Sequence, residues 1–184
     1  MAGRRILTML AVTAAVAAPL AGCGGGGSSK ASPTSYVKSV CTAVGSWVTT
    51  IKGRASQLTT IKPASAAQGR QELQSFISGV ISDTDKALAA IKSAGVPNVS
   101  NGQQVATALQ GAFTQIKGVL AQSQNQANAL PTGSPSAFKT AATKLGTSVQ
   151  QSLSGIAAGL SALRTPDLQK AASQTSACQS LASA

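Results

Sequence analysis

The sequence predicts an all-α fold, an up-and-down bundle of four long helices followed by a shorter C-terminal helix. Apolar residues recur at alternating steps of three and four along most of the chain, which is the spacing of one face of a helix. Breaks that contain proline divide this pattern into five segments, and no pair of alternating segments flanks a short turn as in a β-hairpin. Short connections between long helices favour an antiparallel bundle.

The first helix is expected to begin at Ser32-Pro33, because serine caps a helix well and proline fits its first turn, and to end or restart at Pro63. Its apolar stripe comprises Val37, Cys41, Val44, Val48, Ile51, Ala55 and Leu58. The stripe of the second helix comprises Leu73, Phe76, Ile77, Val80, Ile81, Leu88 and Ile91. This stripe stops at Gly95-Val96-Pro97, where glycine suits the left-handed C-terminal position and proline blocks continuation.

Three further stripes follow. The third comprises Val105, Leu109, Phe113, Ile116 and Leu120, and it weakens before Leu130-Pro131. The fourth helix begins at Ser134-Pro135, and its stripe is Phe138, Ala142, Leu145, Val149, Leu153, Ile156, Leu160 and Leu163. Thr165-Pro166-Asp167 opens the fifth, where the carboxylate complements the helix dipole, and its stripe is Leu168, Ala171, Thr175, Cys178 and Leu181. The packing direction of the fifth helix stays open.

Glycines fall inside the predicted helices, among them Gly79, Gly111 and Gly118. Each costs about 1 kcal/mol relative to alanine at the same position. Propensity alone would leave these helices marginal, so tertiary packing must compensate.

The first 22 residues have the pattern of an export signal. Arg4 and Arg5 precede an apolar run from Ile6 to Leu20, which is too short to cross about 30 Å of hydrocarbon comfortably. Residues 1–22 are therefore expected to be a signal peptide that is removed from the mature protein.

The run ends at Leu20-Ala21-Gly22-Cys23, which resembles the lipobox of bacterial lipoproteins. The resemblance implies cleavage before Cys23, attachment of diacylglycerol to its thiol, and usually a third acyl chain, such as palmitate, on the new amino terminus. Several acyl chains anchor a protein far more firmly than one does. The protein is then expected on the extracytoplasmic face of the cell membrane. The alternative is an ordinary secretory signal followed by a chance cysteine.

The mature chain divides into two parts. Residues 23–33 combine the expected lipidated cysteine with a Gly/Ser-rich tether, and residues 34–184 make up the expected helical bundle domain. Gly/Ser-rich segments behave as random coils. We therefore expect one domain held near the bilayer but free to turn.

If Cys23 is lipidated, Cys41 and Cys178 are the two remaining thiols, and each lies on an apolar stripe. In an exported protein such a pair predicts a disulfide. The alternative is two separately buried free cysteines. A metal site is not expected, because the chain has no histidine and neither cysteine has a second thiol near it in the sequence.

The chain has few residues that could act as a catalytic acid or base. With no histidine the chain lacks the commonest general base, and its only acids are Glu72, Asp83, Asp85 and Asp167. Asp83 and Asp85 are two residues apart, so on a helix they point to different sides, and we expect both to be solvated surface residues. We predict no enzymatic activity, no catalytic residues and no cofactor.

Charge suggests the kind of partner. The mature chain carries 13 basic residues against four acidic ones, spread along the sequence. This balance favours attraction to anionic lipid headgroups or an acidic envelope polymer, although solubility explains it equally well. Nucleic acid is not expected, because the protein is exported and Trp47 and Tyr36 are too isolated to form a stacking platform.

We therefore predict a membrane-anchored, non-catalytic envelope lipoprotein that binds a protein or an anionic envelope polymer. The alternative is a carrier of an apolar or small ligand between the helices. Its pocket would be lined by Trp47, Phe76, Phe113 and Phe138, although aromatic residues at stripe positions are usually core. The composition, the signal and the two distant cysteines also resemble those of small Ala/Ser/Thr-rich lipoproteins of high-GC Gram-positive bacteria. That resemblance implies attachment to the outer leaflet, and it assigns no binding residue.

Overall fold

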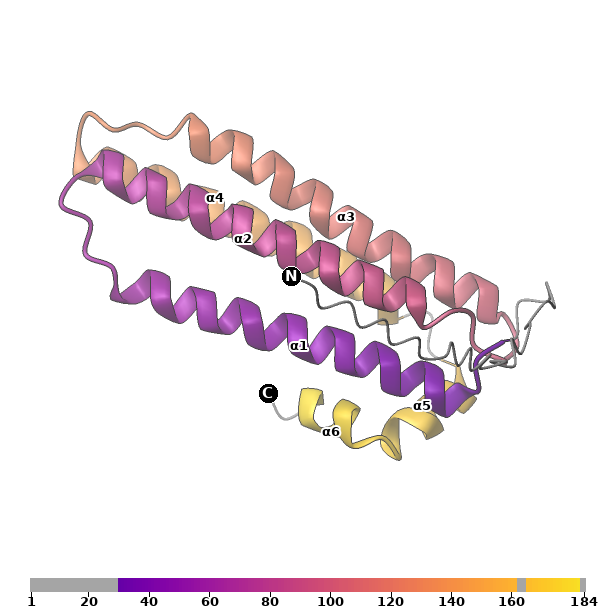
Figure 1. Cartoon of the computed structure of the whole chain (residues 1–184). Helices are drawn as coiled ribbons and strands as arrows, with labels where there is room; N and C mark the ends of the chain where they lie inside the picture. Colours follow the sequence, from indigo (N-terminus) through magenta and orange to yellow (C-terminus); the bar gives the residue numbers. More distant parts are fainter. Residues whose placement is uncertain (1–29, 162–164, 183–184) are drawn as a thin grey trace, which may run out of the picture.

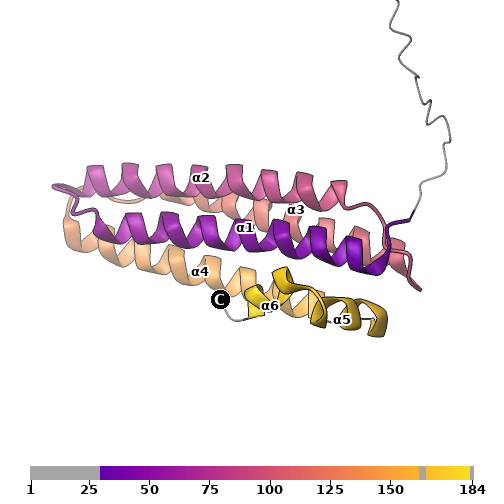
Figure 2. The ribbon, with the colours of Figure 1, turned by 60° about the horizontal axis from the view of Figure 1, so that its bottom comes forward.

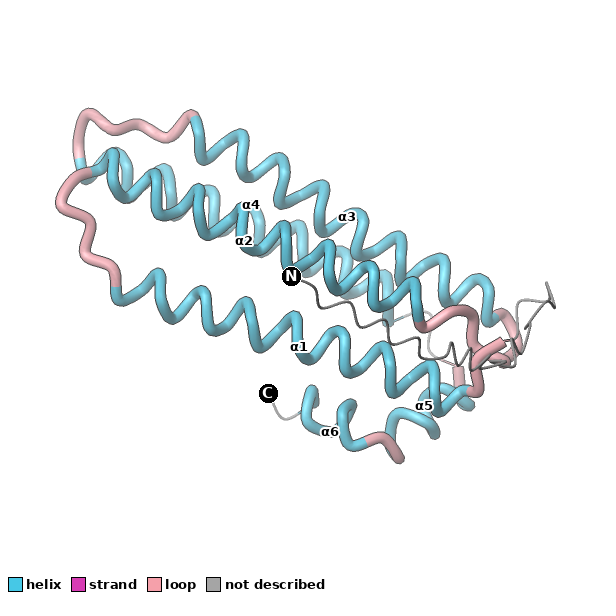
Figure 3. The backbone as a smooth tube through the Cα atoms, viewed as in Figure 1, coloured by secondary structure: helices cyan, strands magenta, loops and turns pink. Residues whose placement is uncertain are grey.

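The described part of the chain is all-helical. A computed structural model describes residues 30–161 and 165–182, and it contains six helices within them (Figure 1). In chain order they are α1 (Pro33–Thr60), α2 (Ala66–Ser93), α3 (Gly102–Asn128), α4 (Pro135–Ser161), α5 (Pro166–Ser173) and α6 (Ser176–Ala182). Figure 3 shows that short loops join the long helices. The prediction of an all-α fold is confirmed for the described residues.

The long helices pack in chain order. Helix α1 packs against α2, α2 against α3, and α3 against α4, whereas α5 and α6 both pack against α1. Figure 2 shows the two short helices following α1 from the end at which α1 begins. The expected set of long helices is thus present, and the C-terminal segment covers one side of the first of them.

Helix ends follow the predicted capping chemistry. Ser32 accepts a hydrogen bond from the backbone N–H of Ser35, and Pro33 is the first residue of α1. Thr165 caps α5 in the same way, and the Ser134 hydroxyl accepts from the N–H of Ala137 at the start of α4. Gly95, which follows the C-cap residue Ala94 of α2, has a φ of 74°, a conformation that glycine adopts without strain.

The expected single C-terminal helix is in fact two. Helix α5 ends at Ser173 and α6 begins at Ser176. At the break, the Thr175 hydroxyl donates to the Ala171 carbonyl at 2.7 Å, and the Thr175 N–H donates to the Ala172 carbonyl. These local bonds replace the regular helical ones, so the chain changes direction and α6 lies against α1.

The core consists of apolar clusters between neighbouring helices. Near the middle, Phe113 of α3 is 3% exposed and meets the Trp47 ring of α1 edge-on, with ring centroids 5.3 Å apart. Ile91 of α2 is buried in the same cluster. Phe76 and Phe138 pack on the cluster built on Ile77 and Leu145. The aromatic residues at stripe positions therefore serve as core, and Trp47 also borders a groove.

The N-terminal end of the described chain is held by backbone hydrogen bonds. The N–H of Ala31 donates to the Val96 carbonyl at 2.8 Å, and the N–H of Asn98 donates to the Ala31 carbonyl at 2.7 Å. The last residues of the expected 23–33 tether thus pair with the loop between α2 and α3. The signal peptide, Cys23 and the rest of the tether lie outside the described residues. Among the helices of the described residues, none is long and apolar enough to span a membrane.

Candidate functional site

An open groove runs along the outer side of the α1–α2 pair. It has a volume of about 1100 Å³, and it extends from Ser35 to Arg54 on α1. An advance of nineteen residues along a helix corresponds to about 28 Å. One wall presents a row of hydroxyl groups from α1, those of Ser35, Ser39, Thr42, Ser46 and Thr50.

The groove exists because small side chains line both helices. Ala43 and Ala87 are buried between them, and Ala90 and Ser93 continue the α2 wall. Larger side chains at these positions would fill the space between the helices. The groove was not predicted from the sequence, although the hydroxyl residues recur at helical spacing along α1 and could have indicated it.

Trp47 borders the groove, and its indole ring is held in place by Thr84 of α2 and Phe113 of α3. Its indole N–H donates to the Thr84 hydroxyl at 3.0 Å, and Thr84, which is fully buried, donates in turn to the Val80 carbonyl at 2.7 Å. The edge-on contact with Phe113 holds the ring from the α3 side. The indole is therefore a rigid surface rather than a mobile one.

A charged network occupies the distal part of the groove. Asp83 is buried, with its side chain 6% exposed, and it accepts hydrogen bonds from Arg54 Nε at 2.5 Å and from Lys86 Nζ at 3.2 Å. The hydrogen bond from Arg54 lowers the pKa of Asp83 below its ordinary value, and this outweighs the opposite effect of burial. Our expectation that Asp83 is a solvated surface residue is wrong, because Arg54, 29 residues earlier, compensates its charge.

Asp85 behaves as expected. It is about half exposed and pairs with Lys117 of α3 at 2.7 Å. Such an exposed pair contributes little to stability.

Gly79 creates the space that Arg54 occupies. A Cβ atom at this position would lie 2.5 Å from Arg54 Nη1 and 2.7 Å from its Cζ. The guanidinium therefore lies against the backbone of α2, where it reaches Asp83.

Two matched substitutions test this arrangement. Gly118→Ala should raise the free energy of unfolding by about 1 kcal/mol, because Gly118 is exposed inside α3 and a methyl group there would meet no other residue within 4 Å. Gly79→Ala should give no such gain, because the methyl displaces Arg54 from Asp83. Urea denaturation of both variants measures the difference. An equal gain in both would show that the methyl group at position 79 costs none of the stability that the Arg54–Asp83 bond provides.

The groove combines positive charge with hydrogen-bonding groups. Lys38, Arg54 and Lys86 line it, and the one carboxylate among its lining residues is the buried and already paired Asp83. Hydroxyl groups both donate and accept hydrogen bonds, and exposed cations attract phosphate or carboxylate groups. The arrangement suits binding of an anionic, hydroxyl-rich molecule. Within the described residues, no three metal-binding side chains gather into a cluster.

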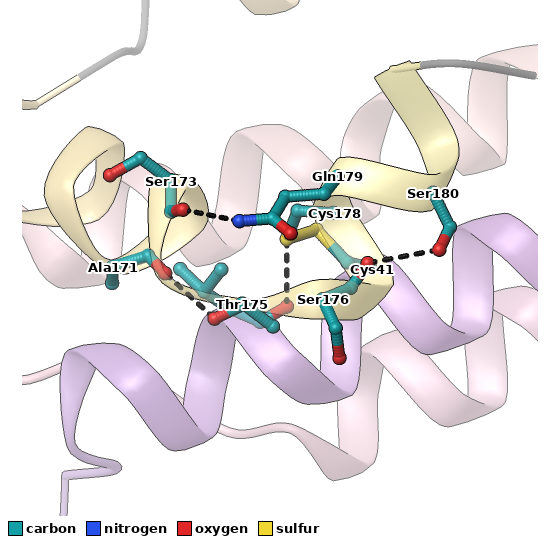
Figure 4. Close-up of a disulfide and its surroundings, with 9 residues drawn as sticks. Cys41, Ala171, Ser173, Thr175, Ser176, Cys178, Gln179 and Ser180 are labelled. Carbon is teal, nitrogen blue, oxygen red and sulfur yellow. Dashed lines mark hydrogen bonds between the residues drawn. A yellow bond between two sulfur atoms is a disulfide. The ribbon is translucent and has the colours of Figure 1, made fainter.

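The predicted disulfide is present. Cys41 of α1 and Cys178 of α6 are joined, with their Cα atoms 5.1 Å apart (Figure 4). The bond ties the C-terminal pair of helices to α1, and Gln179 donates to the Ser173 carbonyl across the α5–α6 break at 2.7 Å. The structure therefore joins two of the predicted site residues, whereas Cys23 lies outside the described part of the chain.

Comparison with known proteins gives no relative. No protein-family model, no curated protein and no solved structure matches the chain.

Proposed function

We propose that this protein is a non-catalytic, lipid-anchored lipoprotein of the cell envelope, whose α1–α2 groove binds an anionic envelope polymer. In this proposal α1 to α4 form an up-and-down four-helix bundle, and α5 and α6 form a clasp on α1. The observation that carries the binding function is the groove itself, with three cations, one compensated carboxylate and a row of hydroxyl groups.

The location rests on the sequence. The apolar run that ends in Leu20-Ala21-Gly22-Cys23 supports export, cleavage before Cys23 and lipidation of its thiol. The Cys41–Cys178 disulfide is in keeping with an oxidising compartment outside the cytoplasm. Both features support the extracytoplasmic face of the cell membrane.

The shape of the groove favours a polymer over a small ligand. Lys38 lies near one end, and Arg54 and Lys86 lie near the other. Lys38 and Arg54 are 16 residues apart on α1, which corresponds to about 24 Å. A chain of repeated anionic units contacts both ends at once, whereas one small molecule reaches only one of them.

A carrier function is the second candidate, and one observation favours it. Trp47 borders the groove beside the buried Ala43 and Ala87, which together make an apolar surface. A ligand with an apolar face and an anionic group would fit there. The indole is the only tryptophan in the chain, so its fluorescence reports on either kind of ligand.

The binding proposal is tested by two double variants with the same change in charge. Lys38→Gln/Lys86→Gln removes two groove cations, and Lys139→Gln/Lys144→Gln removes two from α4. The groove variant should bind poly(glycerol phosphate) about three- to tenfold more weakly than the unaltered protein, because each exposed ion pair contributes up to about 1 kcal/mol. The α4 variant should bind like the unaltered protein.

Calorimetry and Trp47 fluorescence at low salt measure both affinities. Equal weakening in the two variants would show attraction to net charge alone and would overturn the groove as the site. If monomeric glycerol phosphate binds as tightly as the polymer does, the carrier function is favoured over polymer binding.

A further inference from the structure

One end of the molecule lies where the N-terminal segment joins α1, and it carries three exposed lysines, Lys30, Lys92 and Lys170. Lys30 precedes α1, and its neighbour Ala31 is hydrogen-bonded to the loop that follows α2. Lys92 is the penultimate residue of α2. We name these three the tether-end lysines.

Lys170 belongs to the same end through the core. Its neighbour Ala171 is buried with Tyr36 and Val37 from the start of α1 and with Val105 from the start of α3. Figure 1 shows the beginnings of α1, α3 and α5 at this end. The nearby acidic side chain is Asp167 of α5, and among the described residues none of the tether-end lysines forms an ion pair.

The opposite end is also basic, so charge alone does not distinguish the two. Lys62 follows α1 there, and Lys139 and Lys144 lie in the first three turns of α4. These three exposed lysines are the far-end lysines. A helix of the length of α1 separates the two ends by about 40 Å, which is several times the screening length of about 8 Å at physiological salt.

Covalent geometry selects one end. Seven Cα–Cα steps join Cys23 to Lys30, and even a fully extended chain of that length reaches no more than about 25 Å. A lipid anchor on Cys23 therefore keeps the tether end close to the bilayer. A tether this short gives the tether end a high effective concentration at the bilayer. Weak attraction to anionic headgroups is then enough to hold the tether-end lysines against the membrane surface.

We infer that the tether-end lysines rest on the anionic phospholipid headgroups of the membrane that holds the proposed anchor. This inference rests on the proposed lipidation of Cys23 and adds an orientation to it. The long helices then point away from the bilayer, and the α1–α2 groove runs outward from Ser35 near the membrane to Arg54 far from it. A polymer that leaves the membrane surface can follow the groove along its length.

Lysine labelling of the mature protein tests the inference. The chain is purified from its own membrane and reconstituted into vesicles of phosphatidylcholine alone, or of phosphatidylcholine with phosphatidylglycerol. An amine-reactive reagent labels exposed lysines, and mass spectrometry measures each site. On the anionic vesicles the tether-end lysines should react about fivefold more slowly than on the neutral ones. The attraction of one lysine to an anionic leaflet strengthens its binding to the headgroups by about that factor. The far-end lysines should react equally on both, and high salt should remove the difference.

Two charge-matched variants provide controls. Lys92→Gln/Lys170→Gln should reduce the protection of Lys30, whereas Lys139→Gln/Lys144→Gln should leave it unchanged. Equal protection at both ends would mean that the molecule lies flat, and it would overturn the inference, as would no protection at either end.

Flotation with the neutral vesicles separates this inference from the proposed function. A chain that floats with phosphatidylcholine but shows no lysine protection has the anchor without the docking. A chain that does not float has no anchor, and this result overturns both.

Discussion

Cys23→Ala should move this protein from the membrane fraction to the soluble envelope fraction. Two or three acyl chains on Cys23 would each bury many methylene groups at about 0.8 kcal/mol apiece, so their loss removes nearly all of the binding energy. The measurement pairs fractionation with the intact mass of the mature chain. The unaltered protein should lack residues 1–22 and carry the mass of its acyl groups on Cys23.

The matched control is Cys41→Ala/Cys178→Ala, which removes the other two cysteines and should stay with the membrane. The intact mass also matters for Cys23→Ala, because an uncleaved apolar segment from Ile6 to Leu20 could itself hold the chain. A Cys23→Ala protein that has lost that segment and still sediments with membranes would refute the lipid anchor.

The helices and their ends could be predicted from the sequence because their causes are local. The period of the apolar residues, Ser32-Pro33 and Gly95 each act within one or two turns, and the structure shows the cap and the left-handed glycine where they were expected. The division between α5 and α6 had no such signal. The apolar stripe continues through Thr175 without glycine or proline, and the break depends on hydrogen bonds made by that threonine.

The disulfide was predictable because the sequence predicts export, and two thiols on the apolar stripes of an exported chain would leave few alternatives. The groove and its charged network were not, because they require knowing which helices are neighbours. Arg54 meets Asp83 from another helix, and Gly79 leaves the space that the guanidinium occupies. A sequence window around Asp83 shows two acids on different faces and gives no reason to expect burial.

Reduction of the Cys41–Cys178 disulfide should lower the free energy of unfolding by up to about 5 kcal/mol. The two cysteines are 137 residues apart, so the bond closes most of the domain into one loop and restricts the unfolded chain accordingly. Domains of this size are stable by about 5 to 15 kcal/mol, so the loss is a large share of the total. Urea denaturation with and without a thiol reductant measures the change, and the reductant should have no effect on Cys41→Ala/Cys178→Ala.

Reduction of the disulfide should destabilise α6 before the rest of the domain. Among the long helices, α5 and α6 pack mainly on α1, although Ala171 of α5 also packs with Val105 of α3, and α6 is only seven residues long. Without the bond, α6 should open first, while α5 keeps the contacts of Ala171 with Tyr36 and Val37. Hydrogen exchange should therefore rise at residues 176–182 before it rises in α2 or α3. Two alkylatable thiols in the native oxidised protein, or a midpoint that the reductant does not move, would contradict the role of the disulfide. If α6 instead opens together with α2 and α3, the clasp is part of the bundle's cooperative core.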